Sequence, residues 1–285
     1  MTISNITQIH YMTLMYNRRN KGRNDKMDWC ENCFNTGRIG RDSIITYCSC
    51  KYGKKLQQAN FQLLYIKSGL PVNLTKLSLE DFLIQRNHRS GDALTPPQTG
   101  LKKQAKRVVL EYENQILDAL KRKDIFINVG DNKQYSGNNL FFYGGEESGK
   151  SMLAVDILKT AIKKTKTSLS AYYIIWDDLL AELIPFSGIW EDLVDKCKNH
   201  GILCVDSIGK SDISYDNFSH VKARLNTIFK NRLLQNKPTI FTSNYSPQAF
   251  LKDPNSIFNS SIKKSLKIKL DNSCFQDFNT GGGYR

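Results

Sequence analysis

The sequence predicts an α/β domain with a mostly parallel, five-stranded sheet flanked by helices, preceded by a small cysteine-containing module. Three observations support this prediction. From about residue 138 onward, short apolar runs alternate with segments of helical periodicity, which is typical of a parallel sheet with crossover helices. A glycine-rich turn separates the first of these runs from the helix that follows it. Four of the seven cysteines fall between Cys30 and Cys50.

The elements of the α/β domain follow one another in a regular order. A helix is expected first, from Ala105 to about Arg122, where apolar residues recur at helical spacing. The last strand alternates with period two, which is typical of an edge or half-buried strand. The expected strands span residues 138–143, 171–176, 201–205, 238–242 and 265–270, and the expected helices span residues 150–163, 177–183, 190–199 and 217–235.

The segment from Gly144 to Ser151 fits the phosphate-binding pattern G-x-x-x-x-G-K-[ST] at every position. An apolar strand runs into the motif and a helix leaves it, which is the context that this pattern requires. Backbone N–H groups of the turn, the positive end of the helix and the Lys150 ammonium can bind the phosphates of ATP, and the Ser151 hydroxyl can bind Mg²⁺. We expect Glu146 and Glu147 to face solvent. The candidate nucleotide-binding residues are Gly144, Gly145, Ser148, Gly149, Lys150, Ser151 and Met152.

A second apolar strand ends in Asp206, and we expect it to lie beside the strand that enters the phosphate loop. Its carboxylate is then placed to hold Mg²⁺ together with Ser151. We also expect Asn244, after the next strand, to orient the attacking water. The catalytic candidates are therefore Lys150, Asp206 and Asn244. Ser207 occupies the position of the usual catalytic acid, so either Asp212 or another acid reaches the site, or hydrolysis is slow.

The cysteine cluster consists of Cys30 and Cys33, in a C-x2-C pair, and Cys48 and Cys50, in a C-x-C pair. Four thiolates are a preferred ligand set for Zn²⁺, and the segment between the pairs has the pattern of a small hairpin. We therefore expect a structural zinc site; two disulfides or redox-active thiols are the alternatives. The scattered residues Cys197, Cys204 and Cys274 are expected to be buried hydrophobic side chains.

Composition limits the class of protein and of its partners. Of the 285 residues, 40% are hydrophobic, so the chain can bury a core. The formal net charge of +14 favours a polyanionic partner, and basic drift without function is the alternative. No run approaches about eighteen apolar residues, and the first residues lack a secretory pattern. We therefore expect a cytoplasmic protein with reduced thiols and no membrane contact.

Changes in composition divide the chain into five parts. The first is basic and is expected to be a disordered tail, with an organelle-targeting segment as the alternative. A turn-forming segment that contains Pro96-Pro97 favours a linker. The parts are the tail 1–26, a zinc- and partner-binding module 27–85, the linker 86–104, the ATPase domain 105–275 and a flexible tail 276–285.

These motifs, in this order, resemble the DnaC/DnaI-type helicase loaders and the related IstB-type ATPase partners of transposases. The matching stretches are the cysteine module, residues 59–60 with 77–82, residues 139–154, and residues 205–209 with 231–232 and 237–244. The resemblance implies an AAA+ domain, delivery of a replicative helicase or assistance to a transposase, and ATP-dependent self-assembly. It also implies contact with single-stranded DNA for a loader and with duplex DNA for a transposase helper.

Two departures from this family bear on ATP hydrolysis. Ser207 replaces the expected acid, and no arginine appears between residues 256 and 265, where the family has one that reaches a neighbour's ATP. Lys263 or Lys264 is the available substitute, although lysine lacks the planar fork of arginine. A third hypothesis is therefore an ATP-gated adaptor with little or no turnover.

Overall fold

A computed structural model describes residues 30–39, 46–82, 93–128, 134–184, 189–209, 219–252 and 257–270. The chain divides into two compact units, Met1–Gln58 and Ala59–Arg285. The boundary therefore falls inside the segment 27–85 that was predicted as one module. The tails 1–26 and 276–285 lie outside the described residues.

The smaller unit contains a short hairpin. Strands β1 (Arg38–Ile39) and β2 (Thr46–Tyr47) pair antiparallel, with Arg38 opposite Tyr47. Helix α2 (Lys51–Lys67) begins directly after Cys50 and continues across the boundary into the larger unit. The hairpin predicted between the two cysteine pairs is confirmed.

The larger unit is built around the five-stranded parallel sheet that the sequence predicts. The strands lie in the order β6-β7-β8-β5-β9, and every neighbouring pair is parallel. One expectation was wrong: the strand that ends in Asp206 is not next to the phosphate-loop strand, because β8 lies between β7 and β5. The bounds are β5 (Asn139–Gly144), β6 (Ala171–Ile175), β7 (Ile202–Asp206), β8 (Thr239–Ser243) and β9 (Ser265–Leu270).

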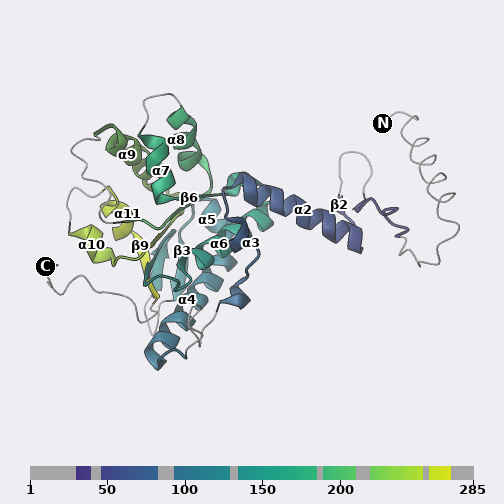
Figure 1. Ribbon diagram of the computed structural model, residues 1–285, viewed down its shortest axis with the longest axis horizontal. Helices are drawn as coiled ribbons and strands as arrows, with labels where there is room; N and C mark the ends of the chain where they lie inside the picture. The colour runs from purple at the N-terminus through teal and green to yellow at the C-terminus, as the bar shows by residue number, and fades with distance from the viewer. Residues whose placement is uncertain are drawn as a thin grey trace. The chain divides into compact units, whose positions relative to one another are not determined.

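Helices cover both faces of this sheet, and Figure 1 shows the sheet between two groups of helices. Along β5, Leu140 and Phe142 pack on one face with α4, α5 and α6, whereas Phe141 packs on the other with α7, α8 and α9. Alternate residues of a strand point to opposite faces, so both faces of the central strand are apolar. The bounds are α4 (Pro96–Asn114), α5 (Ile116–Leu120), α6 (Lys150–Thr165), α7 (Trp176–Leu183), α8 (Ile189–Asn199) and α9 (Ser219–Leu234).

Helix α4 begins inside the segment predicted as a linker. It starts at Pro96 and is preceded by a capping box in which Gln98 Oε1 accepts a hydrogen bond from the Thr95 N–H at 2.9 Å. The pair Pro96-Pro97 thus opens a helix rather than a flexible connection. Residues 86–92 of the predicted linker lie outside the described residues.

A second hairpin, β3 (Ile125–Asn128) with β4 (Gln134–Gly137), was not predicted. The remaining short elements are α3 (Val72–Thr75), η1 (Leu79–Asp81), η2 (Ser168–Ser170), α10 (Pro247–Leu251) and α11 (Asn259–Lys263). No helix among the described residues is long and apolar enough to span a bilayer.

Candidate functional site

The glycine-rich loop connects the end of β5 to the start of α6, as the motif requires. Gly144 has φ of +144°, and a Cβ there would lie 1.5 Å from the carbonyl oxygen of Leu270. Gly149, the N-cap of α6, has φ of +95°, and a Cβ there would lie 2.5 Å from the ring of Phe82. Only glycine fits these two positions without moving the backbone. The close packing of β9 and of Phe82 therefore fixes the path of the loop.

Lys150 lies inside this loop. Its side chain is buried, and its Nζ donates hydrogen bonds to the carbonyls of Gly144 (3.0 Å) and Gly145 (2.6 Å) and to Ser148 Oγ (3.2 Å). Burial lowers the pKa of Lys150 to about 8, and the charges of Asp206 and Glu146 oppose this shift. The loop thus holds an ammonium group whose charge is poorly solvated, which favours an anionic ligand.

Asp206 lies at the end of β7 and collects hydroxyl donors from three other elements. Ser151 Oγ donates to both carboxylate oxygens, at 2.8 and 3.0 Å. Tyr173, from β6, donates to Oδ2 at 2.6 Å, and Thr242, from β8, donates to Oδ1. Ser151 and Asp206, which were both predicted to hold Mg²⁺, therefore lie in direct contact, although β8 separates β7 from β5. These oxygen atoms are the kind of ligand that Mg²⁺ prefers.

Neither Tyr173 nor Thr242 was predicted from the sequence as a site residue. Thr242 belongs to the strand that was expected to carry a polar sensor, and its position next to β7 is what brings it to Asp206. Tyr173 lies in a segment that was predicted only as a strand. Nothing in the local sequence distinguishes the hydroxyl that points to Asp206 from that of Tyr172 beside it.

Asn244 and Ser207 lie at the rim of the site. Asn244 is exposed just beyond β8, and within the described residues no hydrogen bond joins it to Asp206. Ser207 is also exposed, with φ of +62°, and its N–H donates to Thr242 Oγ1 at 2.8 Å. Asp212 lies outside the described residues.

The remaining predicted loop residues fall where the motif places them. Glu146 and Glu147 are exposed, as expected, and Glu147 has φ of +55°. Ser148 is fully buried, and Met152 is buried in the first turn of α6. The carboxylates of the loop are thus on its outer side, and the backbone and Lys150 form the inner side.

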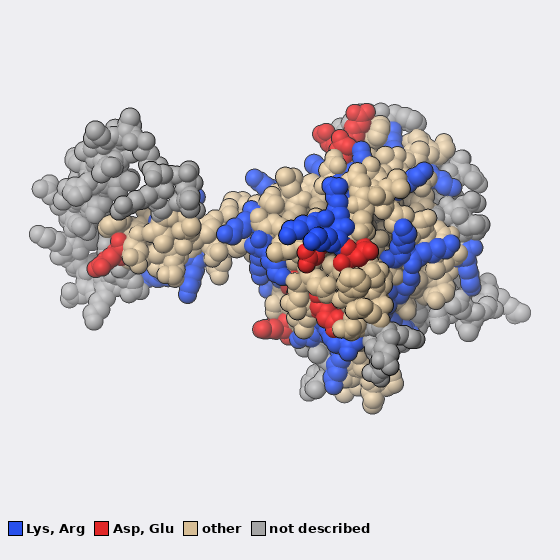
Figure 2. Space-filling view, turned by 180° about the vertical axis from the view of Figure 1, so that it is seen from behind, with Lys and Arg blue, Asp and Glu red and all other residues tan. Residues whose placement is uncertain are grey.

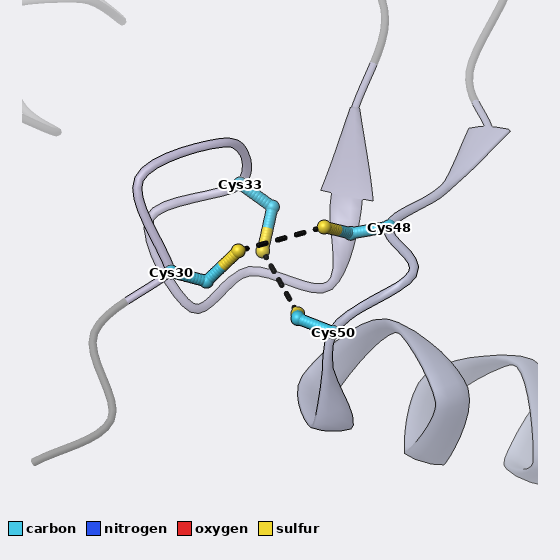
Figure 3. A group of neighbouring side chains, drawn as sticks. All are labelled: Cys30, Cys33, Cys48 and Cys50. Atoms are coloured by element: carbon cyan, nitrogen blue, oxygen red, sulfur yellow. Dashed lines mark hydrogen bonds between the residues drawn. The ribbon is translucent and has the colours of Figure 1, made fainter.

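The four clustered cysteines form a second site, in the smaller unit. Figure 3 shows the side chains of Cys30, Cys33, Cys48 and Cys50 converging, and the four Sγ atoms all lie within 4.8 Å of one another. The Cys30–Cys48 and Cys33–Cys50 sulfur distances are 3.6 and 3.5 Å. The edge of a tetrahedron with Zn–S bonds of about 2.3 Å is about 3.8 Å long, so the cluster has the size of a zinc site.

The backbone around these cysteines is shaped to present the sulfurs. Phe34 and Asn35 have φ of +50° and +63°, and the N–H of Phe34 donates to the carbonyl of Cys30 at 2.7 Å. A hydrogen bond from the Gly53 backbone lowers the pKa of Cys50 to about 6. Cys50 also precedes the positive end of α2, so a thiolate is favoured there.

Comparison with known proteins identifies the fold of the larger unit. No family model matches the sequence, and neither does any curated protein. The crystal structure of the DnaC helicase loader is similar, with a TM-score of 0.50 and 17% identity over 70% of this chain and 99% of that chain. The structure of DnaI has a TM-score of 0.46 and 19% identity, covering 70% and 94%. AMPPCP-bound DnaA from Aquifex aeolicus has a TM-score of 0.46 and 17% identity, covering 68% and 50%. The larger unit thus has the AAA+ P-loop fold.

Proposed function

We propose that this chain is an ATP-binding accessory protein of DNA replication, which delivers a replicative helicase to single-stranded DNA. The observation that carries the proposal is the convergence of Lys150, Ser151 and Asp206 at the carboxyl-terminal ends of the strands of an AAA+ sheet. The likeness in fold to the DnaC helicase loader supports the choice of process.

In this proposal each site residue has a defined task. Backbone N–H groups of the loop from Gly144 to Gly149 and the ammonium of Lys150 bind the β- and γ-phosphates of ATP, with Met152 on the first turn beyond them. Ser151 and Asp206 hold the Mg²⁺ ion, which neutralises phosphate charge when bound. Asn244, exposed at the rim, orients the attacking water and responds to the γ-phosphate.

The rate of hydrolysis depends on a base that activates the attacking water. Ser207 is exposed where the family places an acid, and a serine hydroxyl is a poor base. Asp206 is already bound by hydroxyls from Ser151, Tyr173 and Thr242. An ATP-gated adaptor with little turnover is therefore the second candidate function, and Ser207 is the observation that favours it.

We further propose that the cysteine cluster binds one structural zinc ion and that the module around it contacts the protein partner. Four sulfurs at tetrahedral spacing, on a segment with few core residues of its own, support a metal that stabilises the fold. A replicative helicase is the proposed partner, and a transposase is the alternative. Assembly of several copies in the presence of ATP is part of the same proposal.

The test is ATP hydrolysis by the purified full chain, with and without single-stranded DNA. Wild type is compared with Lys150→Ala, and with Lys163→Ala as a control, because Lys163 is exposed on the same helix. Turnover that rises with DNA and disappears only in Lys150→Ala supports the loader. Tight ATP binding without turnover excludes the motor and leaves the adaptor. Absence of ATP binding contradicts both.

A further inference from the structure

A cleft of about 580 Å³ lies at the amino-terminal ends of the strands of the sheet. Asn139, the first residue of β5, lines it and is paired with Ser265, the first residue of β9. Asn139 Oδ1 also accepts a hydrogen bond from the N–H of Thr239, the first residue of β8, at 2.9 Å. The nucleotide site described above lies where these strands end. The cleft is therefore a separate site, at the opposite ends of the strands.

The lining of the cleft is strongly basic. Among the described residues that line it, the one acid is Asp124, which accepts a hydrogen bond from Asn236 Nδ2 at 2.9 Å. These described residues bring four positive side chains against one negative, a surplus of three positive charges. The basic residues are Arg232, Lys237, Lys263 and Lys264.

Two of these cations are held by the backbone and two are not. The buried guanidinium of Arg232 donates to carbonyl groups, and burial lowers its pKa to about 9, so it remains charged at neutral pH. Lys237 Nζ donates to the carbonyl of Lys198 at 2.8 Å. Lys263 and Lys264 are exposed, and within the described residues their ammonium groups have no hydrogen-bond or ion-pair partner. Arg232 and Lys237 thus set the electrostatic potential, whereas Lys263 and Lys264 are free to bind an anion.

The wall of the cleft also contains Asn138 and Tyr135, which are both held by hydrogen bonds to backbone carbonyls. Asn138 is 3% exposed, and its Nδ2 donates to the carbonyl of Asn236 at 3.2 Å. Tyr135 forms part of the same wall, with its hydroxyl fixed on the carbonyls of Asn139 and Lys264.

We propose that this cleft binds a single-stranded nucleic acid. Lys263 and Lys264 contact phosphates, and one nucleotide enters the cleft beside Tyr135 and Asn138. The volume is in the range of about 300–1,000 Å³ that suits a ligand of nucleotide size, whereas a duplex is too wide to enter. Figure 2 shows further Lys and Arg side chains spread over the visible face of the larger unit, which favours a polyanion over a single small anion.

This inference deepens the DNA-binding part of the proposed function and does not depend on ATP hydrolysis. The family resemblance gave Lys263 and Lys264 a different task, contact with the ATP of a neighbouring copy. Their place in a cleft with Asn138 and Tyr135 favours the nucleic acid. Contact with ATP is then an outcome that the experiment must be able to reveal.

The experiment measures binding of a fluorescent single-stranded oligonucleotide to the full chain by anisotropy, without nucleotide, at several salt concentrations. The variant is Lys263→Gln with Lys264→Gln. The matched control is Lys76→Gln with Lys103→Gln, two exposed lysines outside the cleft. Each lost phosphate contact reduces the slope of log K against log salt by about 0.7, so the variant slope should fall by about 1.4, with roughly tenfold weaker binding. The control should match wild type.

Three results would overturn the inference: equal affinity and slope in variant and wild type, equal binding of a duplex, or no binding by wild type. Loss of ATP turnover in the variant with unchanged DNA binding would assign Lys263 and Lys264 to a neighbour's nucleotide. Photo-crosslinking with bromodeoxyuridine gives an independent readout, and we expect the crosslinked peptide to contain Tyr135. ATP binding by wild type is measured in parallel, so failure of the nucleotide site is distinguished from failure of the cleft.

Discussion

The hydroxyl of Tyr173 in β6 donates a hydrogen bond to Asp206 Oδ2 at the end of β7, with 2.6 Å between the oxygens. The two strands pair in parallel with Ile175 opposite Asp206. Tyr173 is two residues before Ile175, so its side chain extends along the strand direction to reach Asp206. Thr242 reaches the same carboxylate from β8, on the other side. Neighbouring strands therefore fix the orientation of Asp206 independently of any ligand.

Removing this hydroxyl should weaken the site without abolishing the fold. We expect Tyr173→Phe to lower the free energy of unfolding by about 1–3 kcal/mol, because the lost hydrogen bond is to a carboxylate. ATP turnover, where measurable, should fall more than ATP affinity, since the carboxylate loses its orientation. Urea unfolding and steady-state hydrolysis are the measurements. Tyr172→Phe is the matched control, and an equal effect of both variants would contradict the assigned role.

The pH dependence of ATP binding should reveal the buried ammonium of Lys150. In the free protein burial holds its pKa at about 8, and phosphates raise that pKa when they bind. Binding above about pH 8 must therefore take up a proton, so ATP affinity should be constant below this pH and fall by up to about tenfold per unit above it. Titration calorimetry in buffers of different ionisation enthalpy measures the proton uptake.

Lys150→Arg provides the comparison, because a guanidinium stays charged across this range. Its affinity should be lower, since the loop is fitted to a lysine, but it should not change between about pH 7 and 10. A wild-type affinity that is equally insensitive to pH would show that Lys150 is already fully charged without nucleotide.

The sequence predicted the order of elements and the path of the glycine-rich loop because both depend on local patterns. The strand–glycine–helix motif places Lys150 and Ser151 without knowledge of the rest of the chain. The position of Asp206 could not be derived in the same way. Strand order is set by packing between distant segments, and the insertion of β8 between β5 and β7 leaves no local mark. Tyr173 and Thr242 were missed for this reason.

The basic cleft could not be predicted from the sequence, because it too depends on packing between distant segments. It joins residues from β4, α9 and the end of α11, which lie far apart in the chain. The start of α4 at Pro96 is a different case. Thr95 and Gln98 form a capping box that the sequence does contain, but the turn-forming character of Pro96-Pro97 dominated the interpretation.

Metal analysis should test the cysteine cluster directly. We expect about one zinc ion per chain, released by a strong chelator together with loss of structure around residues 30–58, because this segment has few core residues of its own. Cys48→Ser should lose the metal, and Cys197→Ser should retain it, since Cys197 is buried in the larger unit. Two disulfides in place of the metal would appear as a chain without zinc whose smaller unit is sensitive to reductant.

Arg232 should be among the most important residues for stability. Arg232 is 1% exposed, and its guanidinium donates to acceptors at the end of α8 and at the start of β8 rather than to a carboxylate. Those acceptors are the carbonyls of Cys197, Lys198, His200, Gly201 and Pro238 and the hydroxyl of Thr239. The positive charge of Arg232 also lies near the negative, carboxyl-terminal end of the α8 dipole, and this interaction is stabilising.

Arg232→Lys keeps the charge but replaces a planar fork of five N–H donors with three donors on one atom, so several carbonyls lose their partner. We expect the free energy of unfolding to fall by about 3 kcal/mol or more, as for other buried charged groups that lose partners. Urea unfolding monitored by circular dichroism measures this change. Lys230→Met, at an exposed position of the same helix, should change the free energy by less than about 0.5 kcal/mol. A similarly small effect of Arg232→Lys would mean that the acceptors at the end of α8 find other donors, and Arg232 would then matter for the charge of the cleft rather than for the fold.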